Sequence, residues 1–279
     1  MDRFLQLLQN IDRRIIYSLV LLLAIIPFFV AIPLPISPSP PVLNLYNTVE
    51  KIAEENARGN KEKIVLLQFD WDASVQAENW PQSQAMIEHL MQRNVKFAIL
   101  GFVPQGPTLG ESIAGEVAQK YGKKYGEDWV NWGYKSSETT ALRAMVKDLY
   151  SIIDKDIHGT PMKEVAMMRN VSGLQDIGLV FEVTGSGGWE PWVAFVRPEV
   201  GTPVSTGVTA IIGPDVYPFL DSKQVVGMME GLSGAAQYET LVKAPAKATR
   251  GMGSQNLAHF LIIGLIILGN VGYLLSRKG

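Results

Sequence analysis

Residues 63–103 read KIVLLQFDWDASVQAENWPQSQAMIEHLMQRNVKFAILGFV, and this stretch decides the fold class. Ile64–Phe69 is a nearly continuous apolar run that ends in Asp70, which is typical of a strand buried on both faces. Pro81 is expected in the first turn of the helix that follows, and Val95–Val103 is a second buried run. Two such strands joined by one helix predict a right-handed βαβ crossover, the first unit of a parallel sheet.

The alternation of strands and helices continues along the chain. Further strands are expected at Trp129–Tyr134, Leu179–Val183 and Val208–Ile212, and helices at 42–57, 111–124, 139–154, 161–168 and 222–242. This order predicts an α/β domain over residues 63–242, with a doubly wound, mostly parallel five-stranded sheet of the Rossmann-like or flavodoxin-like kind. The last predicted strand and its Gly213-Pro214-Asp215 turn also resemble the second lobe of periplasmic-binding-like domains.

Composition excludes several classes of function. The chain has 279 residues and a net charge of −2, so it has no overall bias toward binding nucleic acid. It has no cysteine, which excludes disulfides, thiolate catalysis and cysteine-ligated metals. Only three histidines occur, so a histidine-rich metal site or a Ser-His-Asp triad has little to draw on.

Two apolar stretches predict membrane-spanning helices between an N-terminal segment (1–14) and a short C-terminal tail (276–279). Residues 15–32 contain only Tyr17 and Ser18 as polar groups, and residues 257–275 are interrupted only by His259 and Asn270. About 18 helical residues cover roughly 27 Å, close to the thickness of a bilayer's hydrocarbon core. A cleaved signal peptide is the rival interpretation of the first stretch; its long n-region and the lack of a clean A-x-A site favour an uncleaved helix.

The segments beside the two spans complete the predicted organisation. Residues 33–62 are a proline-rich spacer followed by a helix, and residues 243–256 are a basic linker rich in small residues. Arg3, Arg13 and Arg14 precede the first span, and no basic residue follows it until Lys51. The excess of basic residues before the span predicts a two-pass protein of the cell membrane with both termini in the cytoplasm and the α/β domain outside it.

Ligands of doubly wound sheets bind beyond the carboxyl ends of the strands, where several loops converge. Candidate ligand-binding residues in those loops are Asp70, Asp72, Ser74, Gly106, Gly185, Gly187 and Asp215. Residues 185–188 (GSGG) are compatible with a phosphate cradle at a helix N-terminus, but they lack the full G-x-G-x-x-G pattern and follow a late strand. A tight turn is the favoured interpretation of this segment, and no cofactor can be assigned.

The sequence Asp70-Trp71-Asp72-Ala73-Ser74 resembles the D-x-D-x-[ST] motif of phosphotransferases of the haloacid-dehalogenase type. The resemblance implies that Asp70 is a nucleophile and Asp72 an acid/base, with Mg²⁺ held by carboxylates. Other parts of that catalytic set cannot be placed, so no catalytic residue and no metal ligand is assigned outside this alternative. The competing interpretation is that Asp70 caps its loop or the next helix while Asp72 is solvated.

Two groups of glycines are candidate interaction sites. Gly227, Gly231 and Gly234 fall on the predicted last helix, where each glycine costs roughly 1 kcal/mol relative to alanine and therefore suggests a close approach to the sheet or to another subunit. In the second span, the small residues form a strip suited to close helix pairing: Gly264, Gly269 and Gly272.

The order FDWDAS, HLMQRNVKFAIL, VNWGYK and GVTAIIGPDVYPFLDSKQVVGMMEGLSGAAQYE between two spans resembles a class of uncharacterised, membrane-anchored prokaryotic proteins. We expect a non-enzymatic structural or interaction subunit of a membrane assembly, whose partners are the membrane and other membrane-protein subunits or further copies of the chain. The alternatives are a Mg²⁺-dependent phosphatase-like hydrolase that uses Asp70 and Asp72, and a membrane-tethered sensor of a small ligand. Nucleic acid is not expected as a partner.

Overall fold

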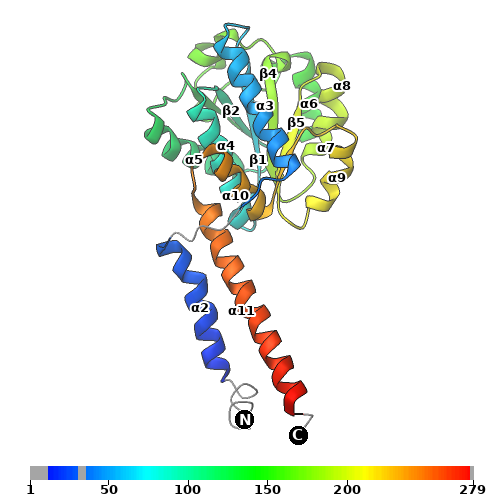
Figure 1. Ribbon diagram of the computed structural model, residues 1–279. Helices are drawn as coiled ribbons and strands as arrows, with labels where there is room; N and C mark the ends of the chain where they lie inside the picture. The colour runs from blue at the N-terminus through cyan, green and yellow to red at the C-terminus, as the bar shows by residue number, and fades with distance from the viewer. Residues whose placement is uncertain (1–11, 31–35, 277–279) are drawn as a thin grey trace. The chain divides into compact units, whose positions relative to one another are not determined.

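The computed structural model describes residues 12–30 and 36–276, which fall into two compact units (Figure 1). Residues 36–248 form the α/β unit. The second unit combines the described part of residues 1–35 with residues 249–276. Arg3, on which the predicted topology partly depends, lies outside the described residues, as do residues 277–279 of the predicted C-terminal tail.

The α/β unit is built on one sheet of six strands in the order β3-β2-β1-β4-β5-β6, and every neighbouring pair is parallel. This is the strand order of the doubly wound dinucleotide-binding folds. Strands are added to one side of β1 as far as β3, and from β4 onward they are added to the other side. The α/β class and the parallel sheet are therefore confirmed. The strands are β1 (Ile64–Asp70), β2 (Phe97–Gly101), β3 (Trp129–Tyr134), β4 (Ile177–Thr184), β5 (Val204–Val208) and β6 (Met228–Glu230).

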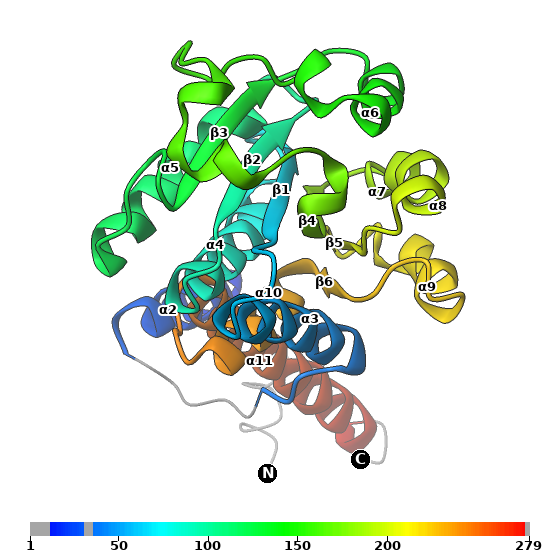
Figure 2. The same ribbon diagram turned by 90° about the horizontal axis from the view of Figure 1, so that it is seen from above.

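Helices cover both faces of the sheet, as Figure 2 shows. Alternate strand residues point to opposite faces, so Leu67 and Phe69 enter one core while Leu66 enters the other. One face carries α3 (Pro40–Ala57), α4 (Gln76–Gln92), α5 (Gly106–Tyr121) and α10 (Gly231–Val242). The other carries α6 (Glu138–Lys147), α7 (Trp189–Pro191), the π-helical turn η5 (Trp192–Val196), α8 (Arg197–Val200) and α9 (Gly213–Asp221).

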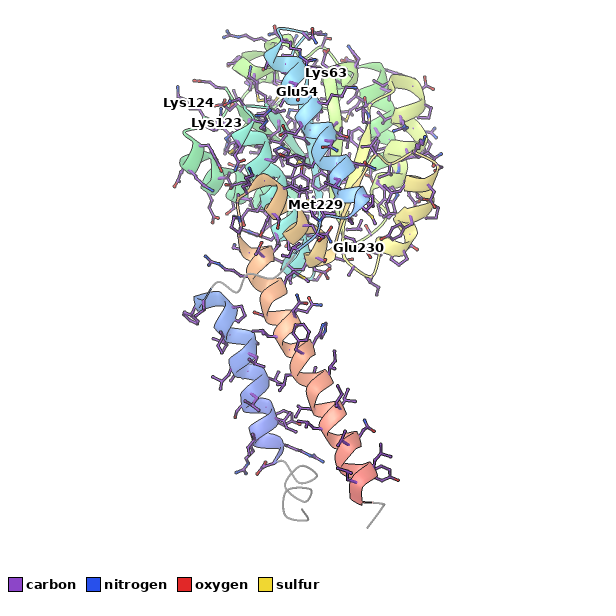
Figure 3. The ribbon with its side chains drawn as sticks, viewed as in Figure 1. Glu54, Lys63, Lys123, Lys124, Met229 and Glu230 are labelled. Atoms are coloured by element: carbon purple, nitrogen blue, oxygen red, sulfur yellow. The ribbon has the colours of Figure 1, made fainter. Side chains whose placement is uncertain are left out.

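The sheet has one strand more than the five predicted, and the predicted fifth strand was misplaced. β5 ends at Val208, where the prediction began, and residues 209–212 form a turn. β6 lies inside the stretch predicted as a helix from residue 222 to 242. Met229 of β6 enters the core, while Glu230 accepts a hydrogen bond from the Tyr217 hydroxyl (2.9 Å). Figure 3 labels Met229 and Glu230.

Three helices also differ from the predictions in their bounds. α4 begins five residues before Pro81, which therefore lies inside the helix and not in its first turn. The predicted helix 139–154 ends at Lys147, because Asp148 is extended and its carboxylate accepts the Tyr150 amide (3.0 Å), which starts a new turn. No α-helix forms at 161–168. Two short 3₁₀ turns, η2 (Met162–Glu164) and η3 (Ala166–Asn170), lie there instead, while η1 (Leu149–Ser151) precedes them and η4 (Leu174–Asp176) follows them.

The second unit contains α2 (Arg13–Phe29) and the larger part of α11 (Lys247–Ser276). Among the described residues, one helix is long and apolar enough to cross a membrane, Lys247–Leu275. The span predicted at residues 15–32 is not shown, because α2 has 17 residues and residues 31–32 lie outside the described ranges. The two helices touch where the Ser254 hydroxyl donates to the Ala24 carbonyl (2.7 Å).

Candidate carboxyl site at the β1–β4 switch point

The carboxyl ends of β1 and β4 lie side by side, with Asp70 paired in register with Thr184. The loop after β1 leads to α4 on one face of the sheet, and the loop after β4 leads to α7 on the other. This divergence is the structural definition of the ligand crevice in doubly wound sheets. Three acidic side chains, a glutamine and a glycine-rich loop meet at this point.

Asp70 ends β1 and is 8% exposed. Its Oδ1 accepts the amides of Phe102 (2.6 Å) and Val103 (3.2 Å) from the loop after β2. Its Oδ2 accepts the side-chain amide of Gln68 (2.6 Å). The carboxylate therefore caps the loop after the neighbouring strand β2, rather than its own loop or the next helix, which the second interpretation of the sequence expected.

Gln68 links Asp70 to a second carboxylate that is distant in sequence. Its Nε2 also donates to Glu138 Oε1 (2.9 Å), in the first turn of α6. Its Oε1 accepts the indole N–H of the buried Trp192 (2.6 Å). Because Trp192 fixes which end of the Gln68 amide carries the donors, the glutamine holds one N–H₂ group between two carboxylates.

Glu182 lies near the carboxyl end of β4 and is completely buried. Its Oε2 shares the Thr206 hydroxyl of β5 (3.1 Å) with the Glu182 backbone carbonyl (3.0 Å), but its Oε1 is buried without a hydrogen-bond partner among the described residues. A Cβ built on Gly188 would lie 2.1 Å from that Oε1 and 3.6 Å from Asp70 Oδ2. The glycine-rich loop thus passes close to two of the three acids, and a side chain at position 188 would require the Glu182 carboxyl group or the loop to move.

No cation balances these acids. Among the described lysine, arginine and histidine side chains, none forms an ion pair with Asp70, Glu138 or Glu182. Glu138 is partly exposed, Asp70 nearly buried and Glu182 fully buried, and these three acids, taken in this order of burial, are called the row.

Burial without a counter-ion sets the protonation of the row. Burial raises the pKa of Asp70, and the amides of Phe102 and Val103 only partly offset it. Burial also raises the pKa of Glu138 to about 7, and the charge of Asp70 adds to this effect. Burial, then the charges of Asp70 and Glu138, raises the pKa of Glu182 well above its usual value. Acids with raised, mutually coupled pKa values in a crevice are typical of functional sites.

The other predicted ligand-binding residues lie around this site without joining its hydrogen bonds. Asp72 is near the surface, and its Oδ1 accepts the amide (2.8 Å) and hydroxyl (2.6 Å) of Ser74. Gly106 opens α5 against β1, where a Cβ would lie 1.7 Å from the Phe69 carbonyl oxygen. Gly185 and Gly187 belong to the loop over Glu182, whereas Asp215 is exposed in the first turn of α9.

The glycines predicted as interaction sites divide into two groups. Gly227 lies before β6 rather than on a helix, and a Cβ there would meet the α3 backbone at 2.5 Å. Gly231 begins α10 with a φ of +57°, and a Cβ on Gly234 would meet the backbone of Met229 at 2.8 Å. These three close approaches are all within the α/β unit. In α11, a Cβ at Gly264 or Gly269 would meet nothing within 4 Å, and Gly272 lies on the same helix.

Sequence reasoning missed Gln68, Glu138 and Glu182. The signal for two of them was present, because Gln68 and Glu182 are polar residues inside otherwise apolar strands. Both lie near the carboxyl ends of adjacent strands and point to the α6–α7 face, so together they predict a polar site. Glu138 gave no such signal, since its contact with Gln68 joins residues 70 positions apart.

Two other features of the structure are weaker candidates for a site. A cavity of about 230 Å³ lies between α4, α5 and residues 244–246, and two glutamates line it; the less exposed one, Glu88, is already paired with Lys120 and the Tyr121 hydroxyl. Among the described residues, no three histidine or acidic side chains are arranged to hold a metal ion. Neither feature contains, among the described residues, a buried carboxyl oxygen without a hydrogen-bond partner, as Glu182 does.

Compared with protein-family models, curated proteins and solved structures, the chain matches none of them. The resemblances drawn from the sequence to membrane-anchored prokaryotic proteins and to phosphotransferases therefore stay predictions.

Proposed function

We propose that this chain is a membrane-anchored α/β domain that binds a small polar ligand at the carboxyl ends of β1 and β4. The observation that carries the proposal is Glu182, an acid buried in a central strand with one carboxyl oxygen unpaired. A domain that only had to pack would be as stable or more stable with an apolar side chain there. A buried polar group with spare bonding capacity at a switch point is instead what a ligand site requires.

The test is native mass spectrometry of the full chain in mild detergent, after incubation with a small-molecule extract of the source cells. The wild type is expected to carry a bound small molecule that Glu182→Leu loses. The matched control is Asp215→Asn, which changes an exposed acid outside the row. Circular dichroism checks that Glu182→Leu folds. Either an empty wild type or an unchanged ligand load in Glu182→Leu would refute the proposal.

We also propose that both apolar segments, α2 with its flanking residues and α11, cross the membrane, with both termini in the cytoplasm and the α/β unit outside it. The charge distribution around the first segment and the length of α11 support this topology. The chain has no cysteine, so single cysteines introduced at Ser37 and Ser276 can be labelled without background. A membrane-impermeant maleimide should label intact cells at position 37 only. Labelling at position 276 would contradict the topology.

A second candidate role, an interaction subunit of a membrane assembly, is favoured by the glycines of α11. The open space around Gly264 and Gly269 leaves room for the close approach of another helix. The wild type should then purify in mild detergent as a complex of defined stoichiometry, and Gly264→Leu should dissociate it, whereas Asn256→Leu outside the strip should not. A wild type that purifies as a monomer would exclude this role and leave the ligand site untouched.

A further inference from the structure

The chemistry of the switch-point site restricts what it can bind. Asp70, Glu138 and Glu182 bring up to three negative charges into one crevice, and no described basic side chain pairs with any of them. The charges must therefore be balanced either by protons or by a cation that comes from outside the protein.

Once its protons have been released, the row offers a ligand only acceptor oxygens. Glu182 Oε1 has no donor, and Gln68 Nε2 is the one described side-chain donor shared between Asp70 and Glu138. That amide also shows what the row accommodates, because an N–H group already bridges two of its carboxylates at 2.6 and 2.9 Å. A ligand that completes the site has to donate hydrogen bonds rather than accept them.

A hard metal ion fits this arrangement poorly. Ca²⁺ and Mg²⁺ need six or more oxygens around one point at roughly 2.0–2.6 Å. The three acids instead differ in burial, and no three acidic or histidine side chains among the described residues converge on a common point. Ammonium and guanidinium groups carry several N–H donors that can engage carboxylates one after another.

We infer that the ligand is a small organic cation with an ammonium or guanidinium group, held by Glu138, Asp70 and Glu182 in exchange for protons. The inference rests on the proposed function and adds its ligand class. The exchange balances in charge, because the protonated carboxyl groups release one proton to the buffer for each positive charge that the cation brings. Glu138, at the outer end of the row, is the first acid that an entering cation meets.

Isothermal titration calorimetry of the full chain in detergent at pH 7 tests the inference, with 1,4-diaminobutane and agmatine as probes. Phosphate and HEPES buffers are compared, because neither is a primary amine and their heats of ionisation differ. At least one probe should bind with a buffer-dependent heat that reports proton release. Glu138→Gln, which keeps the shape of the side chain, should weaken binding about 10–100-fold. Asp221→Asn, which changes an exposed acid at the end of α9, is the control and should bind as the wild type does.

The possible failures are distinguishable. Binding of Mg²⁺ or Ca²⁺ with no response to either amine would overturn the ligand class, and so would a neutral or anionic molecule found in the native mass spectrum; both would leave the ligand-binding function standing. Amine binding that Glu138→Gln does not change would place the cation elsewhere and overturn the assignment. If no probe binds and the wild type is also empty in the mass spectrum, protons alone balance the row and both proposals fail.

Discussion

The two ends of β4 each carry a buried acid, and the two acids are treated in opposite ways. Asp176, immediately before the strand, is 1% exposed and accepts the amide and hydroxyl of Ser172, both at 2.7 Å, together with an ion pair from Lys61. Burial alone would raise the pKa of Asp176, but these partners outweigh it and the pKa is lowered. Glu182, near the other end, has one hydroxyl donor and no cation, and its pKa is raised.

The difference separates acids that stabilise the fold from acids kept for binding. At the amino end of the strand every contact of Asp176 favours its charged form, so the residue contributes to folding. At the carboxyl end, Glu182 makes the folded protein less stable than an apolar residue at that position would. It also lies where doubly wound sheets bind ligands. The same residue class thus has a structural role at one end of the strand and, by our proposal, a functional role at the other.

Removing the paired acid should give the largest effect. Asp176→Ala deletes the acceptor for Ser172 and leaves its amide without a partner, so we expect a loss of about 2–4 kcal/mol in the free energy of unfolding. Urea titration followed by tryptophan fluorescence measures it, with the exposed Asp221→Ala as the control. A loss of unfolding free energy no larger than in the control would show that Asp176 does not stabilise the fold. The proposed difference between the two acids of β4 would then be wrong.

The glycine over the unpaired acid is the next most sensitive position. Gly188→Ala places a methyl group 2.1 Å from Glu182 Oε1, so the loop or the carboxyl group must move. We expect a loss of about 1–3 kcal/mol in unfolding free energy and the loss of the bound ligand in native mass spectra. Gly115→Ala is the matched control, because a Cβ there meets nothing within 4 Å and alanine favours the helix. Equal behaviour of the two variants would mean that the loop over Glu182 is not closely packed.

The parallel sheet could be predicted from the sequence because its central strands are apolar runs that report burial directly. β5 could not, since Ser205 and Thr206 make it look polar. Their hydroxyls donate to backbone carbonyls of β4 at 3.1 and 3.0 Å, which satisfies them inside the sheet. β6 has only three residues and is followed by Gly231, whose positive φ starts the helix at once. Neither feature produces a periodic pattern.

The site was half predictable for a similar reason. Asp70 follows an apolar run, and that position alone identifies it as a candidate. Gln68 and Glu182 lie inside runs of apolar residues that predict buried strands, so the pattern hides them. A polar residue in a buried strand nevertheless needs a partner. Which partner it finds depends on the path of the chain, and the meeting of Gln68 with Glu138 follows only from the packing of α6 on the sheet.

Neutralising the unpaired acid should stabilise the protein, opposite in sign to the change at Asp176. The pKa of Glu182 is raised on folding, so the folded state holds a proton that the unfolded chain releases above about pH 4.5. Its contribution is therefore least unfavourable below that pH and becomes more unfavourable as the pH rises. Glu182→Gln does not titrate and should gain about 1–2 kcal/mol at pH 7, with the gain disappearing near pH 4. Urea titrations across this range measure it, and a loss of stability at pH 7 would mean that Glu182 is ionised and paired.

The smallest effect is expected two residues beyond Asp70. Ser74 donates two hydrogen bonds to Asp72 and thereby lowers the pKa of that carboxyl group. Asn keeps the acceptor oxygen for Ser74, so Asp72→Asn should melt at the wild-type temperature and retain the wild-type ligand load.

A phosphotransferase of the D-x-D type requires the opposite, because its second aspartate is an acid/base. Mg²⁺-dependent hydrolysis of p-nitrophenyl phosphate by the wild type, abolished in both Asp70→Asn and Asp72→Asn, would replace the binding proposal with the enzyme. Loss of ligand in Glu182→Gln with full retention in Asp72→Asn would instead locate the chemistry in the buried row, because the two variants remove one acid each and differ in whether that acid faces the crevice or the solvent.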